Sequence, residues 1–285
     1  MLTFVHLYDE PTAKNLDLSQ LATHLHQWVP SLHVDVRDGF FTYALAGLWG
    51  EARERRLEEL ALAVAQTKVR HPNKPFGPFQ PLPGEVNYEL RRLKNPANPV
   101  FGILYDGWRL LEVLRQLIPQ GEYNLAHLHI IFTNQLFGTW DEGDRRYHAR
   151  VNLCGYPAVI STTGLVEAPA KPRQYYFLKQ QYLALRMDDA AEIASKEQVR
   201  GRFIDHDDER LTEVVKGYVL QALFYHAFGE AFCDDPDCRL FNAHWQEEVL
   251  RAQLGGAYEL CSRHQQMISA LATAKTPARG QGGRR

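Results

Sequence analysis

The positions of three cysteines and one histidine near the C-terminal end constrain this sequence more than any other feature. Cys233 and Cys238 are separated by four residues, and Cys261 and His264 are separated by two. Two short-spaced pairs on either side of a helix-sized insert are typical of a tetrahedral zinc site, because each pair can bend around one ion. Residues 234–237 read Asp-Asp-Pro-Asp, which favours a turn between the first two ligands.

Three thiolates and one imidazole also select zinc over hard ions such as Mg²⁺. We therefore predict one structural zinc ion bound by Cys233, Cys238, Cys261 and His264. Four protein ligands leave no open position for water, so this ion is expected to stabilise the fold and not to take part in a reaction. The simpler alternative is three buried apolar cysteines with an unrelated surface histidine.

The rest of the composition gives no signal for nucleic acid or membrane. The formal net charge is −2, so the chain as a whole does not attract nucleic acid or anionic lipid. No apolar run approaches the roughly 20 residues that a membrane helix needs, and residues 1–6 lack the pattern of a signal peptide. Cys154 stands apart from the three clustered cysteines, which argues against a disulfide framework. These features predict a cytoplasmic protein that does not enter a membrane.

The hydrophobic pattern predicts an α/β (α+β) fold that opens with a β-α-β unit. Residues 2–8 alternate, residues 17–28 carry apolar side chains at three- and four-residue steps, and residues 32–36 alternate again. Two strands joined through a helix favour parallel pairing. Further strands are expected over 100–104, 126–132 and 158–161, and further helices over 51–69, 107–118, 174–185, 207–231 and 247–254.

Two segments depart from this pattern. Residues 72–84 contain five prolines and two glycines, so they are expected to form an extended connector. Residues 273–285 are small, polar and basic, and are expected to form a disordered basic tail.

A resemblance to a known family rests on the stretch that leads into the first metal-ligand pair. Residues 222–233 read Ala-Leu-Phe-Tyr-His-Ala-Phe-Gly-Glu-Ala-Phe-Cys. The stretch resembles the archaemetzincins, zinc-dependent metzincin-type peptidases with the pattern H-E-x-x-H-x-x-G-x-x-H-C, a second cysteine after four residues and a later C-x-x-C pair. The matching positions are His226, Gly229, Cys233, Cys238, Cys261 and His264, with histidine in place of the last cysteine.

The resemblance implies a fold and also exposes departures from the family's chemistry. It implies a metzincin-like mixed twisted sheet with long helices, a C-terminal helical part stabilised by the structural zinc, and one domain over residues 1–272 with an insertion at about 48–99. The first catalytic histidine is replaced by Ala222, the catalytic glutamate by Leu223 and the third zinc ligand by Phe232. One histidine cannot hold a catalytic zinc, and a leucine cannot accept a proton. Whether the chain is an enzyme therefore stays open.

Two hypotheses about function follow from the resemblance. The first, which we favour, is a catalytically inactive metallopeptidase homologue whose former active-site cleft binds a peptide or protein partner along a sheet edge. The second is an active zinc peptidase with rearranged ligands, in which His226 and Glu230 bind a metal with a third residue. The candidates for that third ligand are His148, His206 and His244. His226 is more simply interpreted as a hydrogen-bonded core residue.

A third hypothesis is nucleic-acid binding through the basic tail. Four glutamates within residues 51–59 dilute the second group of basic residues, so the charge pattern disfavours this hypothesis. The residues concerned are Lys275, Arg279, Arg284 and Arg285 in the tail, and Arg53, Arg55 and Arg56 in the charged helix.

Overall fold

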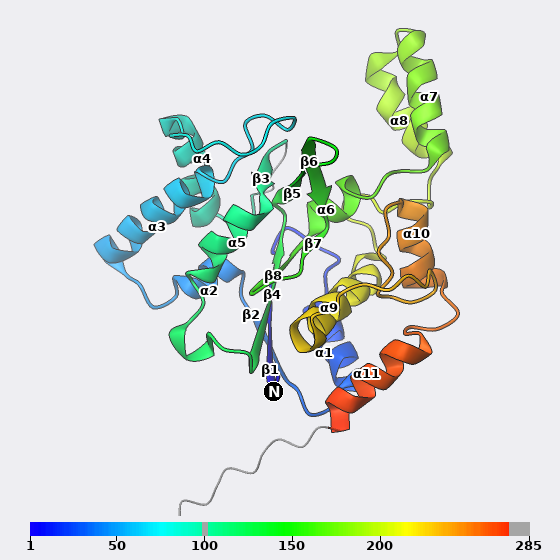
Figure 1. The fold of residues 1–285 in the computed structure, drawn as a ribbon. Helices are drawn as coiled ribbons and strands as arrows, with labels where there is room; N and C mark the ends of the chain where they lie inside the picture. Colours follow the sequence, from blue (N-terminus) through cyan, green and yellow to red (C-terminus); the bar gives the residue numbers. More distant parts are fainter. Residues whose placement is uncertain (99–101, 274–285) are drawn as a thin grey trace, which may run out of the picture.

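The computed structural model describes residues 1–98 and 102–273, and a mixed sheet of five strands lies at its centre (Figure 1). The first four strands in the sheet order are parallel, and the last is an antiparallel edge strand. In sheet order the strands are β2 (His33–Arg37), β1 (Phe4–Tyr8), β4 (His127–Thr133), β8 (Ala158–Ser161) and β7 (Asn152–Leu153).

A smaller sheet of three strands lies beside the first. β3 pairs with β5 in parallel, and β5 pairs with β6 in an antiparallel hairpin. Their bounds are β3 (Leu104–Asp106), β5 (Leu136–Asp141) and β6 (Arg146–Arg150).

The opening β-α-β unit forms as the sequence predicts. Helix α1 (Leu18–Trp28) begins at Asp17, whose side chain accepts hydrogen bonds from the next helical amides. The helix buries Leu18, Leu21 and Leu25 against the sheet, because residues at three- and four-residue steps share one face of a helix. The helical crossover leaves β1 and β2 parallel.

Helices cover both faces of the central sheet (Figure 1). One face packs against α1 and α9 (Leu211–Phe228), and α9 is buried along most of its length. The other face packs against α2 (Phe40–Ala44), α3 (Gly50–Ala65) and α5 (Gly107–Arg115). The remaining helices are α4 (Pro83–Lys94), η1 (Gln120–Glu122), α6 (Thr162–Glu167), α7 (Arg173–Ala184), α8 (Asp188–Gln198), α10 (Gln246–Leu250), the π-helical turn η2 (Arg251–Gly255) and α11 (Ser262–Thr273).

The prediction of an α/β fold with a mixed sheet and long helices is confirmed, with several boundaries corrected. The helix expected over 207–231 begins at Leu211 and ends where Gly229 adopts a φ of 75°. The helix expected over 247–254 divides into α10 and a π-helical turn. The sequence did not predict the β5–β6 hairpin or the helix α4, which begins at Pro83 because proline fits the first turn of a helix.

Several expectations remain predictions. The tail from residue 274 and part of the strand expected over 100–104 lie outside the described residues. The expected insertion at about 48–99 contains α3 and α4, which pack against each other. Within the described residues, no helix is both long enough and apolar enough to cross a membrane.

Candidate metal centre

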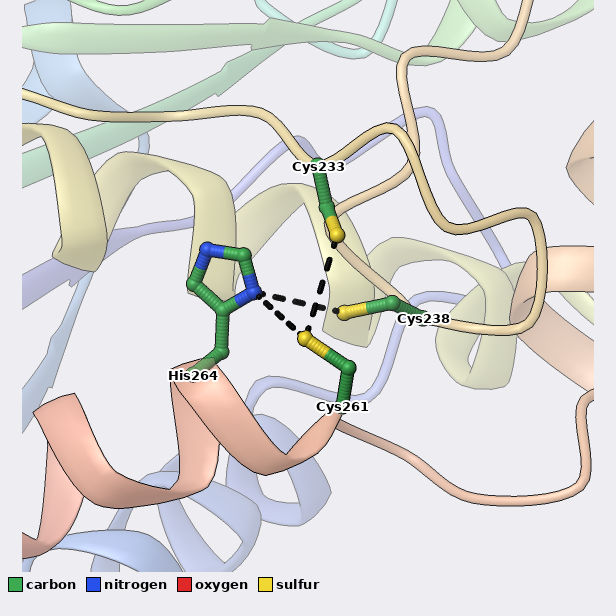
Figure 2. Close-up of side chains that lie close together, drawn as sticks. All are labelled: Cys233, Cys238, Cys261 and His264. Atoms are coloured by element: carbon green, nitrogen blue, oxygen red, sulfur yellow. Dashed lines mark hydrogen bonds between the residues drawn. The ribbon is translucent and has the colours of Figure 1, made fainter.

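The chain brings its two ligand pairs together through the segment that follows α9. Gly229 ends α9 and turns the chain into the loop that carries Cys233 and Cys238. The chain then passes through α10 and returns to α11, where Cys261 directly precedes the helix and His264 lies in its first turn. Figure 2 shows the four side chains pointing toward one another from the loop and the helix. The juxtaposition that the sequence spacing predicts is therefore present.

The distances between the donor atoms fit a single ion. Cys233 Sγ lies 3.9 Å from Cys261 Sγ. His264 Nδ1 lies 3.8 Å from Cys238 Sγ and 3.1 Å from Cys261 Sγ. Sulfur and nitrogen ligands around a tetrahedral zinc ion lie about 3.5–3.8 Å apart, given bonds of about 2.3 Å and 2.1 Å. The two longer distances are close to this range, and the 3.1 Å contact would have to lengthen when an ion binds. All four donor atoms lie within 4.8 Å of one another.

The surroundings of these donors also favour a bound cation. Burial raises the pKa of the Cys233 and Cys238 thiols and lowers the pKa of His264, so without an ion all three groups are neutral. The Nε2 atom of His264 is buried without a hydrogen-bond partner, which costs about 1–3 kcal/mol. A metal bond at Nδ1 leaves the proton on Nε2 and does not supply its missing partner, but the cation would favour the thiolate forms of the cysteines.

Neighbouring groups contact two of the four ligands and hold them in place. The amide of Asp235 donates to Cys233 Sγ over 3.4 Å. The ring of Phe224, from α9, packs edge-on against His264 with 5.2 Å between the ring centroids. Cys238 and His264 have no exposed surface. A site that is closed in this way has no position for a substrate or a reactive water, so it is suited to stabilising the fold.

The positions that correspond to the catalytic part of the peptidase motif form no ligand-type group among the described residues. Ala222 and Leu223 are buried in the core between α9 and the sheet. His226 Nε2 lies 3.0 Å from the carbonyl oxygen of Leu125, and Glu230 forms an ion pair with Arg263. In the described parts of the chain, no group of three ligand-type side chains includes His226.

The three candidate partners of His226 lie elsewhere. His148, on β6, lies 2.8 Å from Asp144 and forms a ligand-type group with Asp141 and Asp144 at the β5–β6 hairpin.

The other two candidates lie in loops. His244 lies in the loop before α10, and its backbone amide donates a hydrogen bond to Glu248. His206 lies in the loop that precedes α9. Neither His206 nor His244 belongs to a ligand-type group among the described residues.

A cavity of about 560 Å³ lies between the edge strand β7 and the C-terminal half of α9. We call it the β7–α9 cavity. Phe232, which replaces a zinc ligand in the resemblance, lines it and is 45 % exposed. Among the described residues, none that lines the cavity is acidic. Its aromatic residues are Trp108, Tyr218, Tyr225, Phe232 and Phe241, and its longer polar residues include His148, Arg150, Asn152, Gln221, Asn242 and His244.

A second group of ligand-type side chains escaped the sequence analysis. His6, Glu122 and His127 form it, and we call these residues with their neighbours Asp35 and His129 the histidine cluster. Burial, with a smaller effect from His6, lowers the pKa of His129 to about 4. The available signal was the histidine or aspartate at every second position in 33–35 and 127–129, together with His6 in residues 4–8, because alternate residues of a strand share one face.

The fold and the metal centre together define an α/β protein with a Cys₃His group suited to holding a metal ion in its C-terminal part. The chain belongs to the probable metallopeptidase family DUF6775, whose family model matches residues 1–271. No curated protein and no solved structure matches it. The match supports the metallopeptidase-like part of the resemblance and leaves the specific likeness to the archaemetzincins as a prediction.

Proposed function

We propose that this chain is a zinc-stabilised, catalytically inactive metallopeptidase homologue that binds an extended peptide segment in the β7–α9 cavity. The proposal has two parts. One zinc ion binds to Cys233, Cys238, Cys261 and His264, and it holds the segment after α9 against the C-terminal helix. The cavity beside that segment binds the partner.

The observation that carries the binding role is the lining of the β7–α9 cavity. Exposed aromatic rings such as Tyr225 and Phe232 offer apolar contact area, and Arg150 with two histidines supplies the ionisable groups. The edge strand β7 forms one wall, and sheet edges are common binding sites for extended peptides. The lining therefore suits a peptide with apolar and acidic side chains.

The residues at the catalytic motif positions support the absence of peptidase chemistry beside this cavity. A zinc peptidase needs about three protein ligands, an open position for water and a general base. The residues at the motif positions are buried in the core or, as Phe232, apolar. His148 is the one residue that belongs both to the cavity lining and to a ligand-type group of the described chain.

Selection of phage-displayed random peptides on the purified full chain tests the binding role. We expect enrichment of apolar and acidic sequences, because the lining is aromatic and carries no carboxylate. Phe232→Ala should weaken the selected peptides by at least about tenfold, since a buried aromatic anchor is worth roughly 2 kcal/mol or more. The matched control is Trp49→Ala, because Trp49 is 79 % exposed and lies outside the cavity. Equal losses in both variants, or no enrichment, would contradict the proposal.

An active peptidase with rearranged ligands is the second candidate, and the group of Asp141, Asp144 and His148 beside the cavity favours it. Digestion of a mixed peptide library by zinc-loaded protein separates the two candidates. We expect no cleavage. Cleavage that disappears in His148→Ala would reverse the assignment.

A further inference from the structure

Strand register builds the face of the central sheet that carries the histidine cluster. β1 pairs in parallel with β2 on one side and with β4 on the other, so alternate residues of the three strands share this face. Each row across the face takes one residue from each strand, in the order β2, β1 and β4. The rows are His33, Phe4 and His127, then Asp35, His6 and His129, then Arg37, Tyr8 and Ile131.

Three donor atoms converge at this face. His6 Nε2 lies 2.8 Å from His127 Nδ1 and 3.8 Å from Glu122 Oε2. Glu122 reaches the group from η1, in the connection that leads from α5 to β4. The three atoms all lie within 4.8 Å of one another, as the ligands of one ion must.

A neighbouring carboxylate orients the central imidazole. His6 Nδ1 contacts Asp35 Oδ1, and because a carboxylate only accepts hydrogen bonds, Nδ1 carries the proton. The Nε2 atom of neutral His6 therefore directs its lone pair at His127 and Glu122. This carboxylate–histidine arrangement is the one that positions histidine ligands in metal sites.

The fixed charges around the three donors favour a cation. Arg37 donates to both oxygens of Glu122 over 2.7 Å and 2.8 Å, and to Asp35 over 2.7 Å. Two carboxylates thus face one guanidinium, which leaves one negative charge uncompensated next to the buried His6. Water already stabilises part of this charge, because the side chain of Asp35 is 49 % exposed, and a bound cation would add a counter-charge beside it.

We propose that His6, His127 and Glu122 form a second metal site, which binds a divalent transition-metal ion such as Zn²⁺ or Co²⁺. Two imidazole nitrogens and one carboxylate oxygen suit such ions better than Ca²⁺ or Mg²⁺. The two ring nitrogens must separate by about half an ångström to accept an ion, given bonds of about 2.0–2.1 Å. His127 is partly exposed, and its ring stacks on Phe4 with 4.7 Å between the ring centroids.

This site differs from the Cys₃His group in its access to solvent. The side chain of Glu122 is 22 % exposed, and His127 is also partly exposed. Three protein ligands would leave at least one coordination position for water or another exchangeable ligand. The proposed site is therefore suited to an exchangeable ligand, whereas the Cys₃His group is closed. It also stands independently of peptide binding in the β7–α9 cavity, so either proposal can fail alone.

Counting bound metal in the full chain tests the second site. Protein with its Cys₃His group occupied is dialysed against buffered free Zn²⁺, and the zinc is measured by elemental analysis. We expect two equivalents in the wild type. His127→Ala and Glu122→Gln should each weaken the second equivalent by about 100-fold or more while the first remains. His33→Ala is the matched control, because His33 lies in the same row as His127 on the other side of Phe4.

The absorption spectrum of bound Co²⁺ identifies the ligands independently of the number of zinc equivalents. The second equivalent should give visible absorption without a thiolate charge-transfer band, and it should persist in Cys261→Ser. One equivalent in the wild type, or a second equivalent that His127→Ala retains, would overturn the proposal. In either case His6 and His127 form a hydrogen-bonded pair without an ion.

Discussion

At the scale of single residues, four donor atoms decide what the C-terminal part of the chain can bind. Cys238 and His264 are fully buried, and the donor atoms of all four side chains converge within metal-ligand range. Without an ion, burial holds the two most enclosed thiols and the imidazole in their neutral forms. A cation changes this balance, because it stabilises thiolates that the surroundings alone disfavour.

Replacing one ligand should therefore remove the zinc and destabilise the fold. We expect Cys261→Ser to lose one zinc equivalent and to lower the melting temperature by about 10 °C, since a loss of about 3–4 kcal/mol shifts a chain of this size by that amount. Cys154→Ser is the matched control, because burial raises the pKa of the Cys154 thiol to about 12 and the residue lies outside the ligand group. His226→Ala should likewise retain the zinc. Equal melting temperatures for Cys261→Ser and the wild type would contradict the structural role.

At the scale of elements, buried ion pairs attach the helices to the small sheet. Glu89 of α4 is fully buried and forms an ion pair with Lys68 over 2.8 Å. It also accepts hydrogen bonds from Arg92 over 2.9 Å and from the hydroxyl of Tyr105 over 2.9 Å. Tyr105 lies on β3, so this one carboxylate joins α4 to the small sheet. A second network, in which His24 and Trp28 contact Glu259, joins α1 to the segment just before α11.

Removing the carboxylate of Glu89 should be costly, because it leaves the buried ammonium of Lys68 without its partner. We expect Glu89→Ala to lower the free energy of unfolding by about 3–5 kcal/mol. The exposed Glu58 of α3 supplies the control, and Glu58→Ala should change stability by no more than about 0.5 kcal/mol. Urea unfolding of the three proteins measures the difference. Similar urea midpoints for Glu89→Ala and Glu58→Ala would show that the buried network contributes little to the stability of the fold.

At the scale of the whole molecule, the metal centre lies where the C-terminal helix α11 packs against the rest of the fold. α11 contacts α1, and Ile268 contributes to the core that also contains α9 and the sheet. Cys233 and Cys238 follow α9, Cys261 directly precedes α11, and His264 lies in its first turn. An ion bound to all four would therefore join the segment after α9 to the start of α11.

Removing the metal should therefore loosen the C-terminal part before it affects the sheet. We expect chelation by EDTA to speed amide hydrogen exchange first in residues 230–271 and only later in β1 and β4. Adding zinc again should restore the protection of these amides against exchange. A uniform loss of protection along the chain would mean that the ion supports the whole fold, and no change at all would mean that it supports none of it.

The sequence by itself determined the local features of this protein. The spacing within Cys233–Cys238 and within Cys261–His264 predicted the ligand pairs, because each pair lies within one loop or one helical turn. Periodicity predicted α1 and the parallel strands on either side of it, because that pattern is also local in the sequence.

Only the tertiary structure determined the histidine cluster and the β7–α9 cavity. His6 and His127 are 121 residues apart, and only the parallel register of β1 and β4 places them in contact. Sequence periodicity assigns a face to each strand but not the register between strands, so contacts of this kind follow only from the folded chain.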